Sequence, residues 1–503
     1  MKLDTAQTDR AAGVLLGQAV GDALGVPYEF ATPPAAGQHA EMLGGGLGNF
    51  APGEWSDDTA MAVCIGEVAA TGMDLTSAEA LDAVAAGFLR WYDSGPADIG
   101  LQTSAVLGST RRRRADGQPA PSSTGAAMSA VAADHAARTS RSAGNGALMR
   151  TSVVALASLD DPEQTANAAR AIANLTHHDE LAADSCVIWS EAIRVAVLEC
   201  KFDFRAGVDL LPRGQRRQWH TWVDEALTLP PGTFTPNGFS VTALQAAIAA
   251  IAQTGVTQQD PGNGSFACLH LQESLHAAVR IGNDTDTVAA IAGGLLGARW
   301  GASAVPWHWR RKVHGWPGLR APDLVAMATR AVNDGHDDEK GWPGATQVPY
   351  DEPASREVVP HPFDERVLLG TMRSTDHAAT AVVSMCRVGA DELGHEHAAP
   401  ENRVESRLQD NDDLTENPNL HFALYDVADA IRGLRNEGHT VLVHCVAAQQ
   451  RTPSAAVAYA VLLGHDPVQA QKAVREALVS TRGHGLVWEA ATQIGERTYP
   501  PHV

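Results

Sequence analysis

The sequence predicts a chain of at least two domains, of which the second has an α/β fold. Three observations predict this division. Residues 9–332 contain long apolar runs with helical spacing, several of them rich in small residues. Residues 333–363 are polar, acidic and rich in proline, which is typical of a linker. Beyond residue 363, short apolar runs alternate with longer amphipathic segments, as in folds with a parallel or mixed sheet.

The first predicted helix covers residues 9–24. Its apolar face is formed by Ala12, Leu15, Leu16 and Ala19. Three glycines, at positions 13, 17 and 21, each cost about 1 kcal/mol in a helix interior. We therefore expect close packing against another helix to offset this cost. Gly25 and Pro27 end the segment and leave Glu29 on the following loop.

Two acidic clusters each precede an apolar run, at residues 61–68 and 288–298. Helix capping is one explanation, since Asp, Ser and Thr are common at helix starts. Buried carboxylates without compensation are costly, however, and a hard cation such as Mg²⁺ is a suitable partner. Because both clusters open a buried helix, we expect them to form one site, a two-metal centre with ions about 3.5–4 Å apart. The six expected oxygen ligands are Ser56, Asp57, Asp58, Asp284, Asp286 and Thr287.

Three features between these clusters are candidates for ligand contact. Gly144-Asn145-Gly146 follows Ser142 and is a turn signal before an apolar run, where successive backbone N–H groups suit a pyrophosphate or ribose. His177 follows Thr176 before the helical run 182–198, although a lone histidine is more often a helix cap or core partner. Phe239 lies in a turn before the predicted helix 241–252, where it could stack on adenine or belong to the core.

From about residue 8 to about 330, the chain resembles the ADP-ribosylglycohydrolases, the enzymes related to dinitrogenase reductase-activating glycohydrolase. The resemblance is carried by Ser56-Asp57-Asp58, by Asp284-x-Asp286-Thr287, and by Gly21-Asp22-Ala23-Leu24-Gly25 with Glu29 after it. It implies an all-α fold, a dimagnesium site that could also take Mn²⁺, and cleavage of an ADP-ribose glycosidic bond.

The resemblance also implies roles for single residues. Glu29 is expected to act in catalysis or to gate the entrance. The expected ligand contacts are Ser142, Gly144, Asn145, Gly146 and His177, of which His177 touches the ligand or the groups around it. The expected partner is an ADP-ribosylated protein or an ADP-ribose derivative. The linkage stays open between ADP-ribosyl-arginine, ADP-ribosyl-serine and a free metabolite.

The second domain contains a possible anion site. Predicted strands at 366–369, 381–386 and 440–443 alternate with predicted helices that cover 419–434, 451–463 and 468–478. His444-Cys445 follows the last strand, and Arg451 completes a Cys-x5-Arg pattern at a helix start. Backbone N–H groups there would hold a phosphate dianion, and Arg451 would bind it as a fork. The same field would lower the Cys445 pKa below its free value of about 8.5 and make the thiolate a nucleophile. The alternative is a buried cysteine in a strand–helix turn.

Over about residues 365–495 this pattern, with His444 and Thr452, resembles the dual-specificity branch of the protein tyrosine phosphatases. The resemblance implies a phosphorylated substrate and an aspartate as general acid before the preceding helix. Asp410, Asp412 and Asp413 are available, and their separation from Cys445 favours Asp412. Ala448 stands where the loop usually has glycine, and alanine is strained if that position needs positive φ. A non-catalytic module that binds phosphate or ADP-ribose is therefore the alternative. The expected domains are 1–332, a linker 333–363 and 364–503.

Composition limits the other function classes. A formal net charge of −21 argues against nucleic acid as a general partner, and the basic run 111–114 is expected to be a solvated loop. No apolar stretch approaches the roughly 20 residues of a membrane span. The first residues lack the apolar core of a signal peptide, and the six cysteines show no paired spacing. These features predict a reduced, cytoplasmic protein without a membrane partner.

Overall fold

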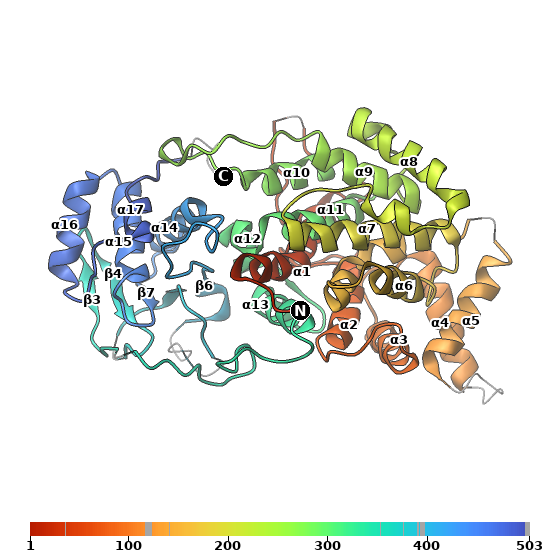
Figure 1. The fold of residues 1–503 in the computed structure, drawn as a ribbon, viewed down its shortest axis with the longest axis horizontal. Coiled ribbons are helices and arrows are strands. Elements are labelled where there is room, and N and C mark those ends of the chain that lie inside the picture. Colours follow the sequence, from red (N-terminus) through yellow and green to blue (C-terminus); the bar gives the residue numbers. More distant parts are fainter. Residues whose placement is uncertain are drawn as a thin grey trace.

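The computed structural model has a helical lobe followed by a smaller lobe built around a sheet (Figure 1). It describes residues 1–35, 37–115, 123–139, 141–352, 354–375, 377–389, 392 and 398–497. The helical lobe lies on the right of Figure 1, and the sheet with helices α14 to α17 lies on the left. The order of the two lobes along the chain agrees with the predicted division into a helical and an α/β part.

Helices and short 3-10 turns make up almost all regular structure of the first lobe. The α-helices are α1 (Thr5–Gly25), α2 (Asp57–Ala69), α3 (Ala78–Asp93), α4 (Leu101–Ala115), α5 (Thr124–Ala136), α6 (Pro162–Ala173), α7 (Glu180–Glu199), α8 (Arg213–Thr228), α9 (Ser240–Ala252), α10 (Leu269–Arg280), α11 (Thr285–Trp300), α12 (Trp307–Lys312) and α13 (Ala321–Ala331). Two 3-10 turns matter for the site, η1 (Val26–Tyr28) and η2 (Asn145–Arg150). A two-stranded ribbon, β1 (His314–Gly315) and β2 (Leu319–Arg320), precedes α13.

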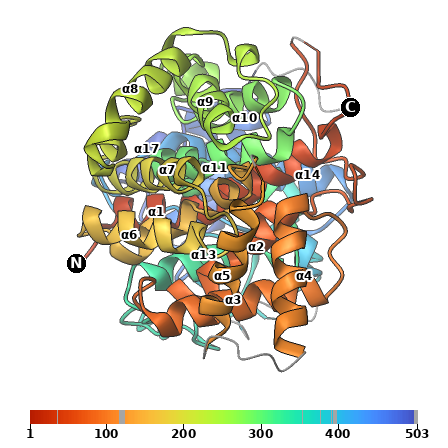
Figure 2. The ribbon, with the colours of Figure 1, turned by 90° about the vertical axis from the view of Figure 1, so that its right-hand side faces the viewer.

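Helices α1 and α11 lie at the centre of the helical lobe and run antiparallel in direct backbone contact (Figure 2). A Cβ atom at Gly17 would lie 2.3 Å from the carbonyl oxygen of Gly293, and one at Gly21 would lie 2.0 Å from that of Ala289. A Cβ atom at Gly13 would lie 2.3 Å from the carbonyl oxygen of Gly297. The glycines thus permit a helix contact that no side chain would allow, as the sequence pattern predicted.

Two local predictions need correction. Helix α1 begins four residues before the predicted Asp9, because Asp4 and Gln7 form a capping box: the Asp4 carboxylate accepts from Gln7 N at 2.6 Å. The basic run is not a loop, since Arg111–Arg113 belong to the last turns of α4. These three side chains are exposed, as expected, and Arg113 forms an ion pair with Asp134 of α5.

The second lobe contains a five-stranded sheet in the order β3-β4-β7-β5-β6. Its elements are β3 (Val359–His361), β4 (Asp364–Thr371), β5 (Ala381–Ser384), β6 (Arg403–Glu405), α14 (Leu420–Asn436), β7 (Val441–Cys445), α15 (Arg451–Leu462), α16 (Pro467–Ala477) and α17 (Leu486–Ala490). Strands β4, β7, β5 and β6 are parallel, and only β3 is antiparallel to its neighbour. Strand β3 lies inside the range 333–363 that the sequence pattern assigned to a linker.

Buried polar contacts join the two lobes. The Trp307 backbone N–H donates to Asp426 of α14 at 2.7 Å, and the Trp307 indole donates to Asp429 at 2.8 Å. Arg310 forms an ion pair with Asp426 at 2.8 Å, and both side chains are largely buried. Gly433 leaves room for the Trp307 ring, because a Cβ there would lie 2.5 Å from it. The lobes therefore pack through specific contacts rather than through a loose tether.

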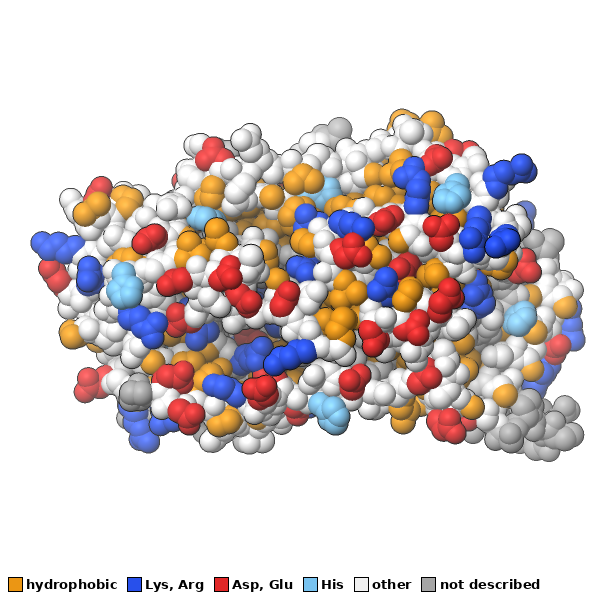
Figure 3. Space-filling view, viewed as in Figure 1, with side chains coloured by type: hydrophobic (Ala, Val, Ile, Leu, Met, Phe, Trp, Pro, Cys, Tyr) orange, Lys and Arg blue, Asp and Glu red, His pale blue; other side chains and the backbone are white. Residues whose placement is uncertain are grey.

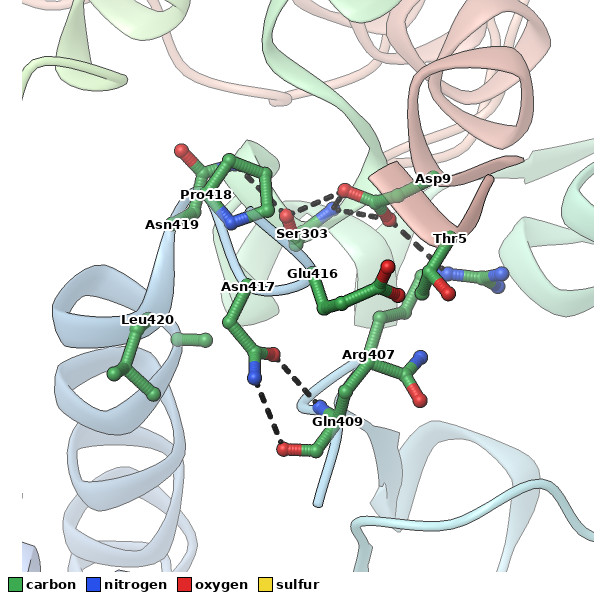
Figure 4. A pocket seen from close by; sticks show the side chains of 11 residues that line it. Thr5, Asp9, Ser303, Arg407, Gln409, Glu416, Asn417, Pro418, Asn419 and Leu420 are labelled. Atoms are coloured by element: carbon green, nitrogen blue, oxygen red, sulfur yellow. Dashed lines mark hydrogen bonds and ion pairs between the residues drawn. The ribbon is translucent and has the colours of Figure 1, made fainter. Parts of the chain in front are cut away.

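A small pocket between the lobes lies at the start of α1 (Figure 4). Asp9 of α1 accepts from the Ser303 hydroxyl at 2.6 Å and forms an ion pair with Arg407 at 3.2 Å. Asn417 donates to the Gln409 carbonyl at 3.1 Å and fixes the loop that leads from β6 to α14. This end of α1 is opposite the end that carries Asp22, so the interface and the acidic clusters lie at different ends of the central helix pair.

The described part of the chain contains no helix long and apolar enough to cross a membrane. On the face shown in Figure 3, acidic and basic side chains are interspersed over both lobes.

Candidate functional site

The two acidic clusters of the sequence meet at one end of the α1–α11 pair. Asp57 and Asp58 begin α2, Asp286 lies in the first turn of α11, and Asp22 lies in the last turn of α1. A Cβ at Gly25 would lie 2.3 Å from the Cα of Asp286. The glycine spacing of α1 therefore brings the end of one helix directly against the acidic start of another.

Asp22 organises the start of α2. Its Oδ1 accepts from Ser56 N at 2.9 Å, and its Oδ2 accepts from the N–H and the hydroxyl of Thr59 at 3.0 and 2.7 Å. The Ser56 hydroxyl in turn donates to Asp58 Oδ2 at 2.9 Å. Asp22 therefore caps α2 from a distant helix and leaves the side chains of Ser56 and Asp58 turned toward the common site.

Five carboxylates form two overlapping groups with metal-ligand spacing. One group is Asp22, Asp58 and Asp286, and the other is Glu29, Asp284 and Asp286; within each group, ligand oxygens lie within 4.8 Å of one another. In the described part of the chain, Asp58 Oδ1 and Asp286 Oδ1 are buried and have no hydrogen-bond partner. Unpaired buried carboxylate oxygens are costly, so this donor set fits hard divalent cations.

The electrostatics of the group suit a bound cation. Burial raises the pKa of Asp57 to about 8, and the nearby carboxylates of Asp98 and Asp22 add to the effect. Burial and the charge of Asp284 raise the pKa of Glu29 to about 9. The pKa values of Asp58 and Asp286 are also raised well above the usual range, first by burial and then by neighbouring carboxylates. Without a cation, these groups retain protons at pH values where carboxylates are normally ionised.

Two asparagines hold the loop that carries Asp284. Asn145 Nδ2 donates to Asp284 Oδ2 at 2.8 Å and to the Asn237 carbonyl at 3.1 Å. Asn237 is fully buried; its Oδ1 accepts from Asp284 N at 3.0 Å, and its Nδ2 donates to the Gly282 carbonyl at 3.1 Å. Asn283, which lies between Gly282 and Asp284, has a φ angle of 61°. Asn145 thus connects the predicted ligand loop directly to the acidic site.

The predicted ligand loop lies beside His177. A Cβ at Gly146 would lie 2.9 Å from His177 Cε1, and one at Gly144 would lie 3.5 Å from His177 Nε2. The Ser142 hydroxyl donates to Asp179 at 2.5 Å, which ties the loop to the N-cap of α7. Phe239 pairs with Gly144 through its backbone, and its side chain is 40% exposed. Phe239 is therefore not a core residue.

Most of the predicted site residues come together, and two contributors were missed. Glu29, Asp58, Asp284 and Asp286 fall in the carboxylate groups. Thr287 lowers the pKa of Asp284 against the larger effect of burial. Asp57 is outside both groups and accepts from Gly100 N at 3.4 Å. The missed contributors are Asp22, which was noted only as part of a motif, and Asn237, whose only signal was its place in a Pro-Asn-Gly turn.

The C-terminal Cys-x5-Arg pattern occupies the carboxyl end of the sheet. Cys445 is the last residue of β7, between β4 and β5, and it is buried. Ala448 has φ of 52°, the left-handed conformation in which alanine is strained. Arg451 begins α15, and its Nη1 donates to the carbonyls of Met385 and Leu408. In the described residues, its Nε is buried without a partner.

Two of the three candidate acids of this lobe, Asp412 and Asp413, differ in their surroundings. Asp413 accepts from the N–H and the hydroxyl of Thr415, which lower its pKa. Asp412 accepts from Leu486 N at 2.7 Å, at the start of α17. A Cβ at Gly485 would lie 2.7 Å from Asp412 Oδ1 and 3.0 Å from Gln450 Nε2. Asp412 therefore lies close to the end of the loop that connects Cys445 to Arg451.

The helical lobe defines a predominantly helical protein with a buried centre, in which carboxylates from distant segments converge next to a glycine-rich loop. The profile of the ADP-ribosylglycohydrolase family matches residues 3–340. The chain belongs to the ADP-ribosylglycohydrolase family.

Similar proteins align with the same part of the chain. The ADP-ribosyl-dinitrogen reductase glycohydrolase of Rhodospirillum rubrum is 28% identical over 314 residues, which cover 61% of this chain and 90% of that protein. The ADP-ribosylarginine hydrolase Tri1 of Pseudomonas putida is 27% identical over 316 residues, covering 61% of this chain and 74% of that protein. A solved structure titled ADP-ribosylglycohydrolase-related protein complex covers 66% of this chain and 99% of its own, with 28% identity and a TM-score of 0.46.

Proposed function

We propose that the helical lobe hydrolyses the N- or O-glycosidic bond of an ADP-ribosylated protein or ADP-ribose metabolite and depends on two Mg²⁺ ions, which Mn²⁺ could replace. The observation that carries this proposal is the cluster of buried carboxylates with unpaired oxygens on Asp58 and Asp286. The proposed ligands are Ser56, Asp57, Asp58, Asp284, Asp286 and Thr287. When bound, the cations would orient the ribose hydroxyls and lower the pKa of the attacking water.

Glu29 is the proposed base. Its carboxylate belongs to the same group as Asp284 and Asp286, and burial with the charge of Asp284 raises its pKa to about 9 in the absence of a cation. Bound cations would lower this pKa, and the ionised carboxylate could then take a proton from water as the water oxygen forms a bond to the ribose C1. The glycosidic bond breaks as this new bond forms, and the leaving nitrogen or oxygen receives a proton from solvent or the one that Glu29 took from water. The alternative role for Glu29 is to gate the entrance.

The loop from Ser142 to Gly146, with His177, is the proposed ADP-ribose contact. Asn145 touches Asp284, so a ligand on this loop is next to the acidic centre. The exposed ring of Phe239 is paired through its backbone with Gly144 and is suited to stack on the adenine.

A direct comparison of substrates is needed to identify the linkage that the helical lobe cleaves. The printed names of the two relatives point to ADP-ribosylated protein, and one names arginine. We therefore expect an ADP-ribosyl-arginine peptide to be cleaved faster than an ADP-ribosyl-serine peptide or an O-linked ADP-ribose metabolite. The test measures release of free ADP-ribose from each, with and without Mg²⁺. No release from any of the three would contradict the proposal.

For the C-terminal lobe we propose a cysteine-dependent phosphatase that acts on a phosphorylated substrate. Its support is the placement of Cys445 at the end of a central parallel strand and of Arg451 at the start of the next helix. Cys445 would attack phosphorus and form a phosphocysteine, while Asp412 protonates the leaving oxygen. Water then releases phosphate and restores the thiol. The strained conformation of Ala448 favours the second candidate, a module that binds phosphate or ADP-ribose without turnover.

One experiment separates these two roles. The wild type and Cys445→Ser are assayed with an aryl phosphate across pH, and the rate of Cys445 alkylation by iodoacetate is measured. A phosphatase turns over the ester and alkylates faster than an ordinary thiol, whereas Cys445→Ser keeps phosphate binding and loses turnover. Phosphate binding without turnover or fast alkylation in the wild type would support the binding module.

A further inference from the structure

Arg150 is a buried cation behind the ligand loop. Its side chain is fully buried at the end of η2, stacks over the Phe88 ring at 4.5 Å, and has no carboxylate in ion-pair contact among the described residues. Its Nη2 donates to the Thr176 hydroxyl oxygen at 2.7 Å and to the Ile172 carbonyl at 3.4 Å. A buried guanidinium without a carboxylate partner is costly, so its placement needs a reason.

The contact with Arg150 determines how the Thr176 hydroxyl is used. An arginine can only donate, so the Thr176 oxygen accepts from Arg150 and its own proton needs another acceptor. Among the described residues, the only other partner of this hydroxyl is His177 Nδ1, at 2.8 Å. Thr176 is completely buried, so bulk water does not reach its hydroxyl. The Thr176 hydroxyl therefore donates to His177 Nδ1, and the ring proton must be on Nε2.

The Nε2 side of the ring faces the ligand loop. Cβ atoms placed at Gly146 and Gly144 would lie 3.1 and 3.5 Å from His177 Nε2, so only a loop without side chains at these positions leaves this nitrogen open. No hydrogen bond from Nε2 occurs within the described part of the chain. Gln102 Nε2 bridges the Ser142 and Thr176 carbonyls at 3.1 and 3.2 Å and keeps the loop and the histidine together.

We propose that Arg150 and Thr176 are positioning residues that hold His177 as the neutral Nε2–H tautomer, so that it donates a hydrogen bond to an oxygen of the ADP-ribosyl group beside Gly144 and Gly146. This inference rests on the proposed function of the helical lobe. Arg150 has a role in it that needs no contact with substrate. Because Arg150 can only donate, it determines the direction of the hydrogen bond from Thr176 to His177 Nδ1 and, through the tautomer, of the bond from His177 Nε2 to the ligand.

The charges around the His177 ring also favour its neutral form. Burial lowers the His177 pKa to about 3, and the cation of Arg150 and then His135 of α5 add to this effect. An imidazolium would also leave the Thr176 hydroxyl proton without an acceptor. The His177 donor therefore stays neutral over the physiological range, and binding through it does not titrate near pH 6.5, where an ordinary histidine does.

The test uses the full chain labelled with ¹⁵N-histidine, with the His177 signals assigned by their loss in His177→Gln. The wild type is expected to show a neutral Nε2–H ring from about pH 5 to about pH 8. Thr176→Val removes the hydroxyl, so the tautomer should shift toward Nδ1–H. KM for the ADP-ribosylated peptide should then rise about tenfold, the order of one hydrogen bond, with kcat changed much less.

Two controls separate positioning from stability. Thr176→Ser keeps the hydroxyl and should restore both the tautomer and KM. Thr165→Val removes another fully buried threonine hydroxyl, which lies in α6 and donates to the carbonyl of Ser158 before that helix, and should change neither. A wild-type ring that is Nδ1–H or charged at neutral pH, or a Thr176→Val ring with unchanged tautomer, would overturn the inference. A wild type that cleaves no ADP-ribosylated substrate would contradict the proposed function, whereas the tautomer result stands independently of turnover.

Discussion

Replacing Gly21 by alanine tests how the fold holds the acidic centre. The new Cβ would lie 2.0 Å from the carbonyl oxygen of Ala289, whereas ordinary contact begins at 3.4 Å. Helices α1 and α11 would have to separate locally by about 1.4 Å, the difference between these distances. Asp22 follows Gly21 directly, and Asp286 is less than one turn from Ala289, so the separation would pull the two carboxylates apart.

The expected cost has two parts. Overpacking of this kind lowers the free energy of unfolding by about 1–3 kcal/mol, although alanine is the better helix former by about 1 kcal/mol. A displacement of about 1 Å at a catalytic group costs about 10²-fold in rate. We therefore expect Gly21→Ala to lower both the free energy of unfolding, measured in urea, and the turnover of an ADP-ribosylated peptide.

Gly214→Ala is the matched control. Gly214 lies in the first turn of α8, and a Cβ there would meet no atom within 4 Å. This variant should leave turnover unchanged and leave stability equal or slightly higher, by up to about 1 kcal/mol. If Gly21→Ala matches Gly214→Ala in both measurements, the close helix contact does not position the site.

Three further predictions follow from single groups. In the metal-free folded state, the pKa of Asp22 is raised to about 6 and that of Asp57 to about 8. Between about pH 4 and about pH 8 the folded state therefore binds more protons than the unfolded chain. Tm of the metal-free protein should fall as the pH rises through this window. Added Mg²⁺ should restore Tm most at the upper end of this window; an increase of Tm with pH in metal-free protein would refute the reasoning. Glu29→Gln should lower turnover by about 10²–10⁴-fold, and activity within about twofold of the parent would exclude a catalytic role. Ala448→Gly removes a strain of about 1–2 kcal/mol at φ of 52°, offset in part by about 0.5–1 kcal/mol of chain entropy, so urea unfolding should show a small gain in stability rather than a loss.

Local patterns were enough to predict much of the fold. Helical spacing with glycine at 13, 17 and 21 indicated a buried, closely packed helix, because only a helix contact offsets the cost of those residues. The strand before Cys445 and the helix from Arg451 were also readable, since an apolar run and a helix start flank them. The short strand β3 was missed because Pro360 lies within it, and proline disfavours a strand assignment.

The site was predicted only in part because several of its contacts join residues far apart in the sequence. The acidic clusters were visible as carboxylates at the start of apolar runs. The role of Asp22 depends on hydrogen bonds to Ser56 and Thr59, and that of Asn237 depends on a bond to Asp284 N. No spacing rule reports such long-range pairs. The sequence predicted that both clusters form one site and that the glycine-rich helices pack closely, but it did not show that α1 and α11 pack against each other.

The metal dependence of hydrolysis tests the central claim most directly. Wild type and Asp286→Asn are compared for release of ADP-ribose from an ADP-ribosyl-arginine peptide, first in excess chelator and then with Mg²⁺ restored, while Mg²⁺ binding is measured by calorimetry on the same samples. The account predicts that the wild type loses activity in chelator and regains it with Mg²⁺, and that folded Asp286→Asn has neither activity nor normal binding. Undiminished wild-type turnover in excess chelator would contradict it.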